Sequence, residues 1–205
     1  VMGHDACRKI CILASLAFGR HVVPAQVPTQ GITEITAEDV ALAEAAGMKI
    51  KLLGRAVRRE DGKAAAYVAP HLIPQEEPLA GVEDVFNGIV VRGNASGDLM
   101  FYGRGAGKLP TASAVSADII DAVKHPDRRK DLDWAPGGEN VTFDPESLEM
   151  AWYVRAGAQA EELAEKLHGR VVTAGASAAV LTEPMTKGQL REKLGGDAYV
   201  LPVLA

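Results

Sequence analysis

Apolar residues dominate the first stretch of the chain. Residues 3–19, GHDACRKICILASLAFG, carry their charges in the opening turns and are apolar on almost every side thereafter. Such a pattern predicts a helix that is buried all round. Asp5 and Lys9 are four residues apart and therefore share one face of this helix. We expect this first turn to lie at the edge of the core or at a cleft, because the rest of the helix is expected to be buried.

Helical and strand patterns alternate between residues 36 and 125. An apolar period with acidic residues in its first turn predicts a helix that Thr36 caps and Gly47 ends. Thr111 is expected to cap a second helix, which Pro126 closes. The intervening strands are expected at residues 49–58 and 63–74, and a hairpin is expected to turn at residues 93–98. This alternation favours an α/β (α+β) fold with one sheet that helices cover mainly on one face.

The composition changes between residues 125 and 147, where the chain is polar, contains Pro and Gly and has no period. This stretch predicts a linker. The residues after it alternate in the order strand, helix, strand, strand, helix, strand, which is the order of a small ferredoxin-like domain. We therefore expect one domain at residues 1–124, a linker at 125–147 and a second domain at 148–205.

Charge and composition exclude several classes of protein. With 205 residues, 47% of them hydrophobic, the chain is long enough to bury a core. Its formal net charge is −5, and acidic and basic residues are interspersed along the chain. This distribution argues against a nucleic-acid partner. Neither an apolar run of membrane-spanning length nor a signal peptide is visible, so we expect a cytoplasmic protein with no membrane partner. The abrupt start at Val1 suggests a piece of a longer protein.

The cysteines, histidines and serines give little indication of chemistry. Cys7 and Cys11 lie one helical turn apart, and we interpret them as buried free thiols, because no further Cys or His completes a metal-ligand set. The five histidines are scattered, so no metal site is expected. Ser113 and Ser116 lack the sharp turn around a nucleophilic serine, so no catalytic triad is expected.

Two short stretches leave alternatives open. Asp5 and Lys9 are compatible with a surface ion pair and with chemistry on a substrate. Residues 103–115, GRGAGKLPTASAV, place glycines between a strand and a helix, where backbone N–H groups favour an anion. This stretch matches neither the Walker pattern nor the dinucleotide fingerprint. Its pattern alone fits a tight turn as well as it fits a ligand loop.

Both stretches resemble one family, homoserine dehydrogenase. Residues 3–19 are similar to the family's G-x-D-x-x-R-K pattern followed by an apolar helix. Residues 103–119, GRGAGKLPTASAVSADI, are similar to its G-x-G-A-G-x-x-P-T-A-S-A-V segment. The shorter matches GI, KLLG, P…L and N fall between them in the expected order. The resemblance covers roughly residues 1–124.

The resemblance implies an oxidoreductase that interconverts L-homoserine and L-aspartate 4-semialdehyde with NADP or NAD, on the path to threonine, methionine and isoleucine. By this resemblance Lys9 is the acid/base for the substrate hydroxyl, and Asp5 accepts a hydrogen bond from the substrate ammonium. Gly105, Ala106 and Gly107 lie against the cofactor, and the enzyme is a homodimer.

The family's nucleotide-binding half, which holds most of the cofactor site, lies upstream of the residues present here. We therefore expect this chain alone to be inactive.

Residues 149–205 resemble the ACT regulatory module. RAGAQAEEL stands where that module has its effector-binding turn, so we expect a degenerate module that dimerises. The alternative is a stand-alone amino-acid-binding or oligomerisation module without catalysis.

Overall fold

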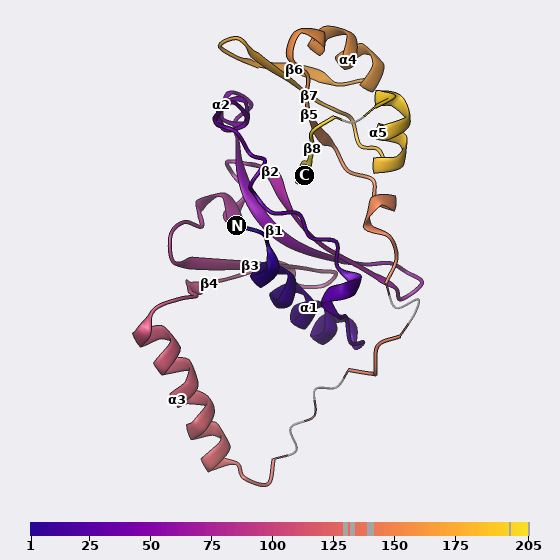
Figure 1. The fold of residues 1–205 in the computed structure, drawn as a ribbon. Coiled ribbons are helices and arrows are strands. Elements are labelled where there is room, and N and C mark those ends of the chain that lie inside the picture. The colour runs from indigo at the N-terminus through magenta and orange to yellow at the C-terminus, as the bar shows by residue number, and fades with distance from the viewer. Residues whose placement is uncertain (129–130, 132–133, 139–141, 197, 205) are drawn as a thin grey trace. The chain divides into compact units, whose positions relative to one another are not determined.

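The structure, a computed structural model, describes residues 1–205 apart from 129–130, 132–133, 139–141, 197 and 205 (Figure 1). The chain forms two compact units, Val1–Pro74 with Leu132–Ala205, and Gln75–Asp131. We refer to them as unit 1 and unit 2. These units reflect packing. The expected functional division at residues 124 and 148 stays a prediction, and part of the expected linker lies outside the described residues.

In unit 1, helix α1 (His4–Phe18) packs by one face against strands β1 (Met48–Arg58) and β2 (Ala64–Pro74) (Figure 1). Its buried apolar side chains recur at helical spacing, and they are Cys7, Ile10, Cys11 and Ala14. Ile12 and Leu16, on the opposite face, are 55% and 56% exposed. The expected all-round burial is therefore wrong within this structure, because the sheet covers one stripe of the helix.

Strands β1 and β2 pair antiparallel along their whole length, from Met48 opposite Pro74 to Arg58 opposite Ala64. A 3-10 turn (Pro24–Gln26) and helix α2 (Ala37–Ala45) precede them. The Thr36 hydroxyl accepts a hydrogen bond from the Asp39 backbone N–H, which confirms Thr36 as the cap of α2. Strand β2 is buried from Ala64 to Ile73, so both of its faces lie in the interior.

The C-terminal part of unit 1 has the expected order of strands and helices. Its elements are β5 (Trp152–Arg155), α4 (Ala160–Leu167), β6 (Arg170–Ala174), β7 (Ser177–Leu181), α5 (Lys187–Leu194) and β8 (Val200–Pro202), with 3-10 turns at Pro145–Ser147 and Gly157–Gln159. The strands form an antiparallel sheet in the order β6-β7-β5-β8. This is the ferredoxin-like arrangement that the sequence predicts, and with it the mixed fold class is confirmed.

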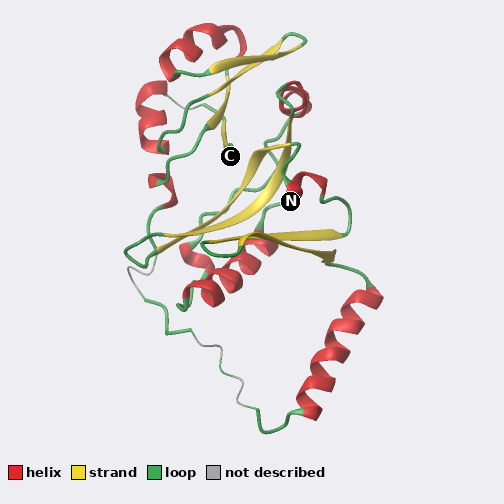
Figure 2. Cartoon of the chain, turned by 180° about the vertical axis from the view of Figure 1, so that it is seen from behind, coloured by secondary structure: helices red, strands yellow, loops and turns green. Residues whose placement is uncertain are grey.

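Alternate residues of this sheet enter two different cores. Trp152, Val154 and Val180 pack with α4 and α5, whereas Tyr153 and Leu181 pack with Leu42 and other side chains of α2 and β2. The second face of the sheet is thus covered by residues from the N-terminal part of the chain. The views in Figures 1 and 2 both show α2 beside the strands of this sheet.

Unit 2 consists of a 3-10 turn (Pro78–Gly81), a hairpin of β3 (Phe86–Gly93) and β4 (Gly97–Arg104), and helix α3 (Lys108–Lys124). The expected hairpin is confirmed. The expected cap is wrong, because α3 begins at Lys108 with Gly107 as its N-cap, and Thr111 lies within the first turns. Pro110 is tolerated there because the N–H groups of a first helical turn have no partner inside the helix.

Candidate functional site

Asp5 and Lys9 form an ion pair on the outer face of α1. Lys9 Nζ lies 2.8 Å from Asp5 Oδ2, and the two side chains are 54% and 82% exposed, respectively. The expectation that they lie at a core edge or cleft is wrong within this structure. Ile12 and Leu16 follow them on the same face, so an apolar strip continues the charged turn. The pair lies on the side of α1 that the sheet does not cover.

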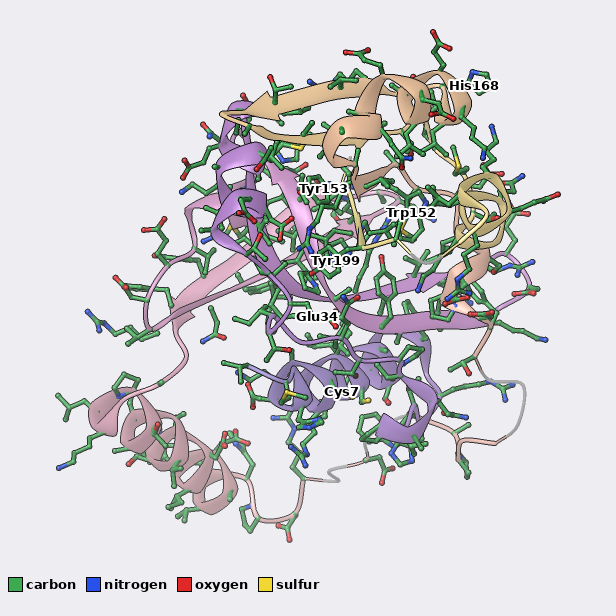
Figure 3. All side chains as sticks on the ribbon, turned by 45° about the horizontal axis from the view of Figure 1, so that its top comes forward. Cys7, Glu34, Trp152, Tyr153, His168 and Tyr199 are labelled. Carbon is green, nitrogen blue, oxygen red and sulfur yellow. The ribbon has the colours of Figure 1, made fainter. Side chains whose placement is uncertain are left out.

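The cysteines of α1 lie on its buried face. Cys7 and Cys11 are free and buried, which confirms the interpretation of both as buried free thiols. Figure 3 labels Cys7 on α1. Burial raises the pKa of the Cys11 thiol to about 11. A thiol held in this form is a poor nucleophile and a poor metal ligand.

Gly105, Ala106 and Gly107 join β4 to α3 in unit 2. Gly107 has a φ of 119°, a value that side-chain-bearing residues rarely adopt, and among the described side chains none caps α3. A Cβ at Gly105 would overlap the side-chain amide of Asn87. The residue that precedes the first turn of α3 is therefore a glycine, which has no side chain to accept hydrogen bonds from the backbone N–H groups of that turn.

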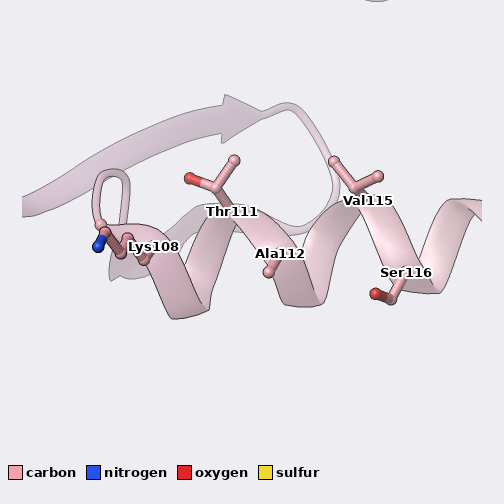
Figure 4. Close-up of a pocket in the computed structure, with 6 residues that line it drawn as sticks. Lys108, Thr111, Ala112, Val115 and Ser116 are labelled. Atoms are coloured by element: carbon pink, nitrogen blue, oxygen red, sulfur yellow. The ribbon is translucent and has the colours of Figure 1, made fainter.

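A shallow, open depression begins at Gly107 and follows one face of α3 (Figure 4). It is lined by Gly107, Lys108, Thr111, Ala112, Val115 and Ser116. The free N–H groups at the helix start, with Lys108 beside them, suit a phosphate group. This geometry is compatible with an anion, which is one of the two alternatives that the sequence pattern leaves open for the loop.

The structure brings Asp5 and Lys9 together in unit 1, and it places Gly105, Ala106 and Gly107 at the start of α3 in unit 2. Among the described residues, no cluster of His, Cys, Asp and Glu has the makings of a metal site. Within the same residues, none of the helices has the length and apolar character that spanning a bilayer requires.

A buried carboxylate that the sequence patterns did not single out links distant parts of unit 1. Asp39, on α2, is 0% exposed and accepts hydrogen bonds from Tyr153 Oη at 2.7 Å and from Arg155 Nε at 3.0 Å. Tyr153 extends from β5 into this interior (Figure 3). Burial acts to raise the pKa of the Asp39 carboxyl, but its hydrogen bonds, first that from Arg155, outweigh burial and hold the pKa below its usual value.

A second buried polar group is His71 on β2. Its Nδ1 donates to the Ala69 carbonyl at 2.8 Å, and its Nε2 accepts from the Tyr67 hydroxyl at 3.2 Å, the tautomer being the one that satisfies both bonds. Arg55 Nη1 donates to that hydroxyl at 3.3 Å. Burial lowers the pKa of His71 to about 4, so the imidazole is neutral at neutral pH. The local pattern of β2 gave no signal for this network, because its members pair only in the folded sheet.

The family profile described as homoserine dehydrogenase matches residues 1–120, which include both quoted motifs and all the candidate residues. The chain belongs to the homoserine dehydrogenase family. Among curated relatives, the homoserine dehydrogenase of Mycobacterium leprae is 46% identical over 129 residues, which are 61% of this chain and 29% of that protein. The homoserine dehydrogenase of Pseudomonas aeruginosa is 40% identical over 162 residues, 76% of this chain and 37% of that protein.

Solved structures of homoserine dehydrogenases are similar over the whole chain. The enzyme of Thiobacillus denitrificans superposes with a TM-score of 0.84 at 27% identity, and 53% of that chain is covered. The enzyme of S. aureus superposes with a TM-score of 0.77 at 31% identity, and 54% of that chain is covered. The present chain therefore spans about a third of the length of the curated relatives and about half of the solved chains.

Proposed function

We propose that this chain is the substrate-binding and proton-transfer part of a homoserine dehydrogenase, which interconverts L-homoserine and L-aspartate 4-semialdehyde with NADP or NAD. The observation that carries the proposal is the Asp5–Lys9 pair on the uncovered face of α1, within the segment that matches the family. By its length, the chain accounts for only part of such an enzyme. We therefore infer that it needs a nucleotide-binding half to turn over.

In the proposed reaction, the substrate hydroxyl loses its proton to Lys9 as the carbon that bears it loses a hydride. The nicotinamide, when bound, supplies the acceptor for that hydride. In the reverse direction, the Lys9 ammonium returns the proton to the carbonyl oxygen of the semialdehyde. Atoms and charge balance, because alcohol and oxidised cofactor give aldehyde, reduced cofactor and one proton.

Asp5 is proposed to hold the α-ammonium of the substrate. An exposed ion pair contributes on the order of 0–1 kcal/mol, so a bound ammonium can take the place of Lys9 at the Asp5 carboxylate with little penalty. This exchange also frees Lys9 for the hydroxyl. The same helix face then addresses the two ends of one small amino acid.

Gly105, Ala106 and Gly107 are proposed to contact the cofactor, with its phosphates near the start of α3. Support comes from the first turn of α3, which no described side chain caps, and from Gly107, which has no side chain and a φ of 119°. The proposed partners are homoserine and a second copy of the chain in a homodimer. Threonine and methionine synthesis in the cytoplasm are the proposed setting, and the C-terminal region is proposed to be a degenerate ACT-like module.

The test is homoserine-dependent reduction of NADP or NAD, followed at the nicotinamide absorbance, by the chain joined to a nucleotide-binding half. Lys9→Ala is expected to lower kcat by about 10²- to 10⁴-fold, the usual contribution of general acid–base catalysis. Asp5→Asn is expected to raise the KM for homoserine with a smaller change in kcat. Lys124→Ala, which removes a lysine at the far end of α3, is the control.

If the Lys9→Ala variant turns over homoserine as fast as the parent protein does, Lys9 is not the acid/base. Absence of turnover with either cofactor, in a folded parent protein, would overturn the proposed function altogether. Binding of homoserine or another amino acid by that inactive protein would favour the non-catalytic module.

A further inference from the structure

Two glycines lie against the end of α1 that carries Asp5 and Lys9. Gly3 is the N-cap of the helix, and Gly54 lies in the middle of β1 beneath it. Gly54 is also the last residue of KLLG, one of the short matches to the family pattern, and the proposed reaction gives it no role.

At Gly54, strand β1 approaches the backbone of α1 closely. A Cβ built on Gly54 would lie 3.0 Å from the Cβ of Ile10 and 3.4 Å from the carbonyl oxygen of Ala6. Neither atom lies at the end of a flexible side chain, so neither can move aside by a rotamer change. Any residue other than glycine at position 54 must therefore displace the helix or the strand by a few tenths of an ångström.

Gly3 fixes the start of the helix on the same part of the sheet. Its φ of 82° is left-handed, and a Cβ there would lie 2.9 Å from Thr29 Cγ2 and 3.3 Å from Val68 Cγ1. Val68 is the residue paired with Gly54 across the sheet, and its backbone also hydrogen-bonds to the segment around Thr29. One row of the sheet thus supports the beginning of α1.

Further along the helix the supporting residues have side chains. Ala56 and Ala66 pack with the core that contains Cys11 and Ala14, whereas Gly54 faces the turn that contains Ala6 and Ile10. Lys9 lies within the turn from Ala6 to Ile10, which is the turn that Gly54 touches. A displacement of that turn carries Lys9 and Asp5 with it.

We propose that Gly54 is a positioning residue, which sets the depth of the first turns of α1 on the sheet and thereby the place of Lys9 relative to the substrate hydroxyl. This inference rests on the proposed function. Gly54 lies on the opposite side of the helix from the charged pair and touches no reacting atom. It acts through the helix backbone, as Gly3 does at the helix start.

Gly54→Ala, assayed in the chain joined to a nucleotide-binding half, tests the proposal. A misplacement of about 1 Å costs on the order of a hundredfold in rate, so a shift of a few tenths of an ångström is expected to lower kcat about tenfold. The KM for the cofactor is expected to be unchanged. The primary isotope effect with homoserine deuterated at its hydroxyl-bearing carbon is expected to rise, because the chemical step becomes slower than product release.

Two controls separate position from stability. Ile10→Val retains the Cβ and a Cγ facing Gly54 and is expected to leave kcat unchanged. Val180→Ala removes buried methyl groups in the C-terminal core, which lowers stability without a change near α1, and is also expected to leave kcat and the isotope effect unchanged. Both are assayed below their melting temperatures.

A folded Gly54→Ala variant with the kcat and isotope effect of the parent would overturn the proposal, even where Lys9→Ala is inactive and the proposed function stands. If Gly54→Ala does not fold, Gly3→Ala tests the same support from the helix start, with the same expected loss of kcat. If neither folds, the glycines serve the stability of unit 1 and not the placement of Lys9, and the proposal fails. An inactive parent protein would defeat the proposed function first.

Discussion

Arg155, at the end of β5, donates two hydrogen bonds to the carboxylate of Asp39 on α2. Its Nε lies 3.0 Å from Oδ1, and its Nη2 lies 2.5 Å from Oδ2. The Arg155 guanidinium also lies over the ring of Tyr199, 4.1 Å from its centroid. Asp39 is fully buried and Arg155 is 39% exposed, so the pair closes the edge of the core between α2 and the C-terminal sheet.

Removal of Arg155 is expected to be costly. Arg155→Met leaves the buried Asp39 carboxylate without its cation, and we expect a loss of about 3 kcal/mol in the free energy of unfolding, the lower end for a broken buried pair because Arg155 is partly exposed. Urea unfolding of the isolated chain measures this change. The double variant Asp39→Asn with Arg155→Met is expected to recover part of the loss. The single variant Asp39→Asn is measured as well. If the loss of unfolding free energy in the double variant equals the sum of the losses in the two single variants, the two residues do not interact.

His71 makes the stability of the chain depend on pH. Its folded-state pKa of about 4 lies below the unfolded value of 6.5, so between these values the unfolded chain binds more protons and stability falls as the pH is lowered. The contribution is complete above pH 6.5, and about 3 kcal/mol of it is lost by pH 4, at about 1.4 kcal/mol per pKa unit.

The lowered pKa of Asp39 adds a loss in the same direction at lower pH, since a depressed carboxyl pKa contributes stability above the unfolded value and loses it as the pH falls. His71→Gln isolates the histidine, because glutamine cannot titrate. We expect its unfolding free energy to be nearly flat from pH 6.5 to 4.5, whereas that of the parent falls. Parallel curves for the two proteins would show that His71 is not the titrating group.

The two faces of α1 are expected to respond oppositely to a carboxylate. Ala14 is 1% exposed, so Ala14→Asp buries an unpaired charge and should prevent folding of unit 1. Leu16 is 56% exposed, so Leu16→Asp should retain the thermal transition and circular dichroism of the parent chain. Equal loss of structure in both variants of the isolated chain would contradict the one-sided packing of α1.

The thiols of α1 are expected to be unreactive in the folded chain. Cys7 and Cys11 are buried, and the pKa of Cys11 is raised to about 11, so little thiolate is available at pH 8. Iodoacetamide at pH 8 should label neither cysteine of the native chain and both in denaturant, as mass spectrometry of the intact protein can count. Rapid labelling of the native chain would mean that α1 opens from the sheet.

Local signals in the sequence were sufficient for much of the fold. Thr36 caps α2 as its pattern predicts, and the strand and helix order of the C-terminal part is confirmed, because caps and periodicity act over a few residues. The sequence pattern predicts the start of α3 at Thr111, which is wrong, because the preceding loop already ends at Gly107. The apolar pattern of α1 predicts burial on every side, but Ile12 and Leu16 are exposed, because hydrophobicity alone does not say which face has a partner.

The buried polar groups could not be predicted from the sequence, for a different reason. Asp39 and Arg155 are 116 residues apart, and each alone is an ordinary charged residue at the start of a helix or the end of a strand. The ion pair of Asp5 and Lys9 can be predicted from the sequence, because the two residues are one helical turn apart. The contact of that turn with Gly54 cannot be predicted in this way, since only the crossing of α1 over β1 brings the two together.

The covering of the C-terminal sheet by α2 has a consequence for how this protein is made. Leu42 and Leu72 share a core with Leu181 and Leu201, so the first part of the chain cannot complete its own interior before the last strands exist. On the ribosome, helix α2 and the β1–β2 pair must therefore keep apolar surface exposed until strands β7 and β8 have also emerged. A chain that stops before β7 and β8 should therefore aggregate and should not form a smaller folded protein.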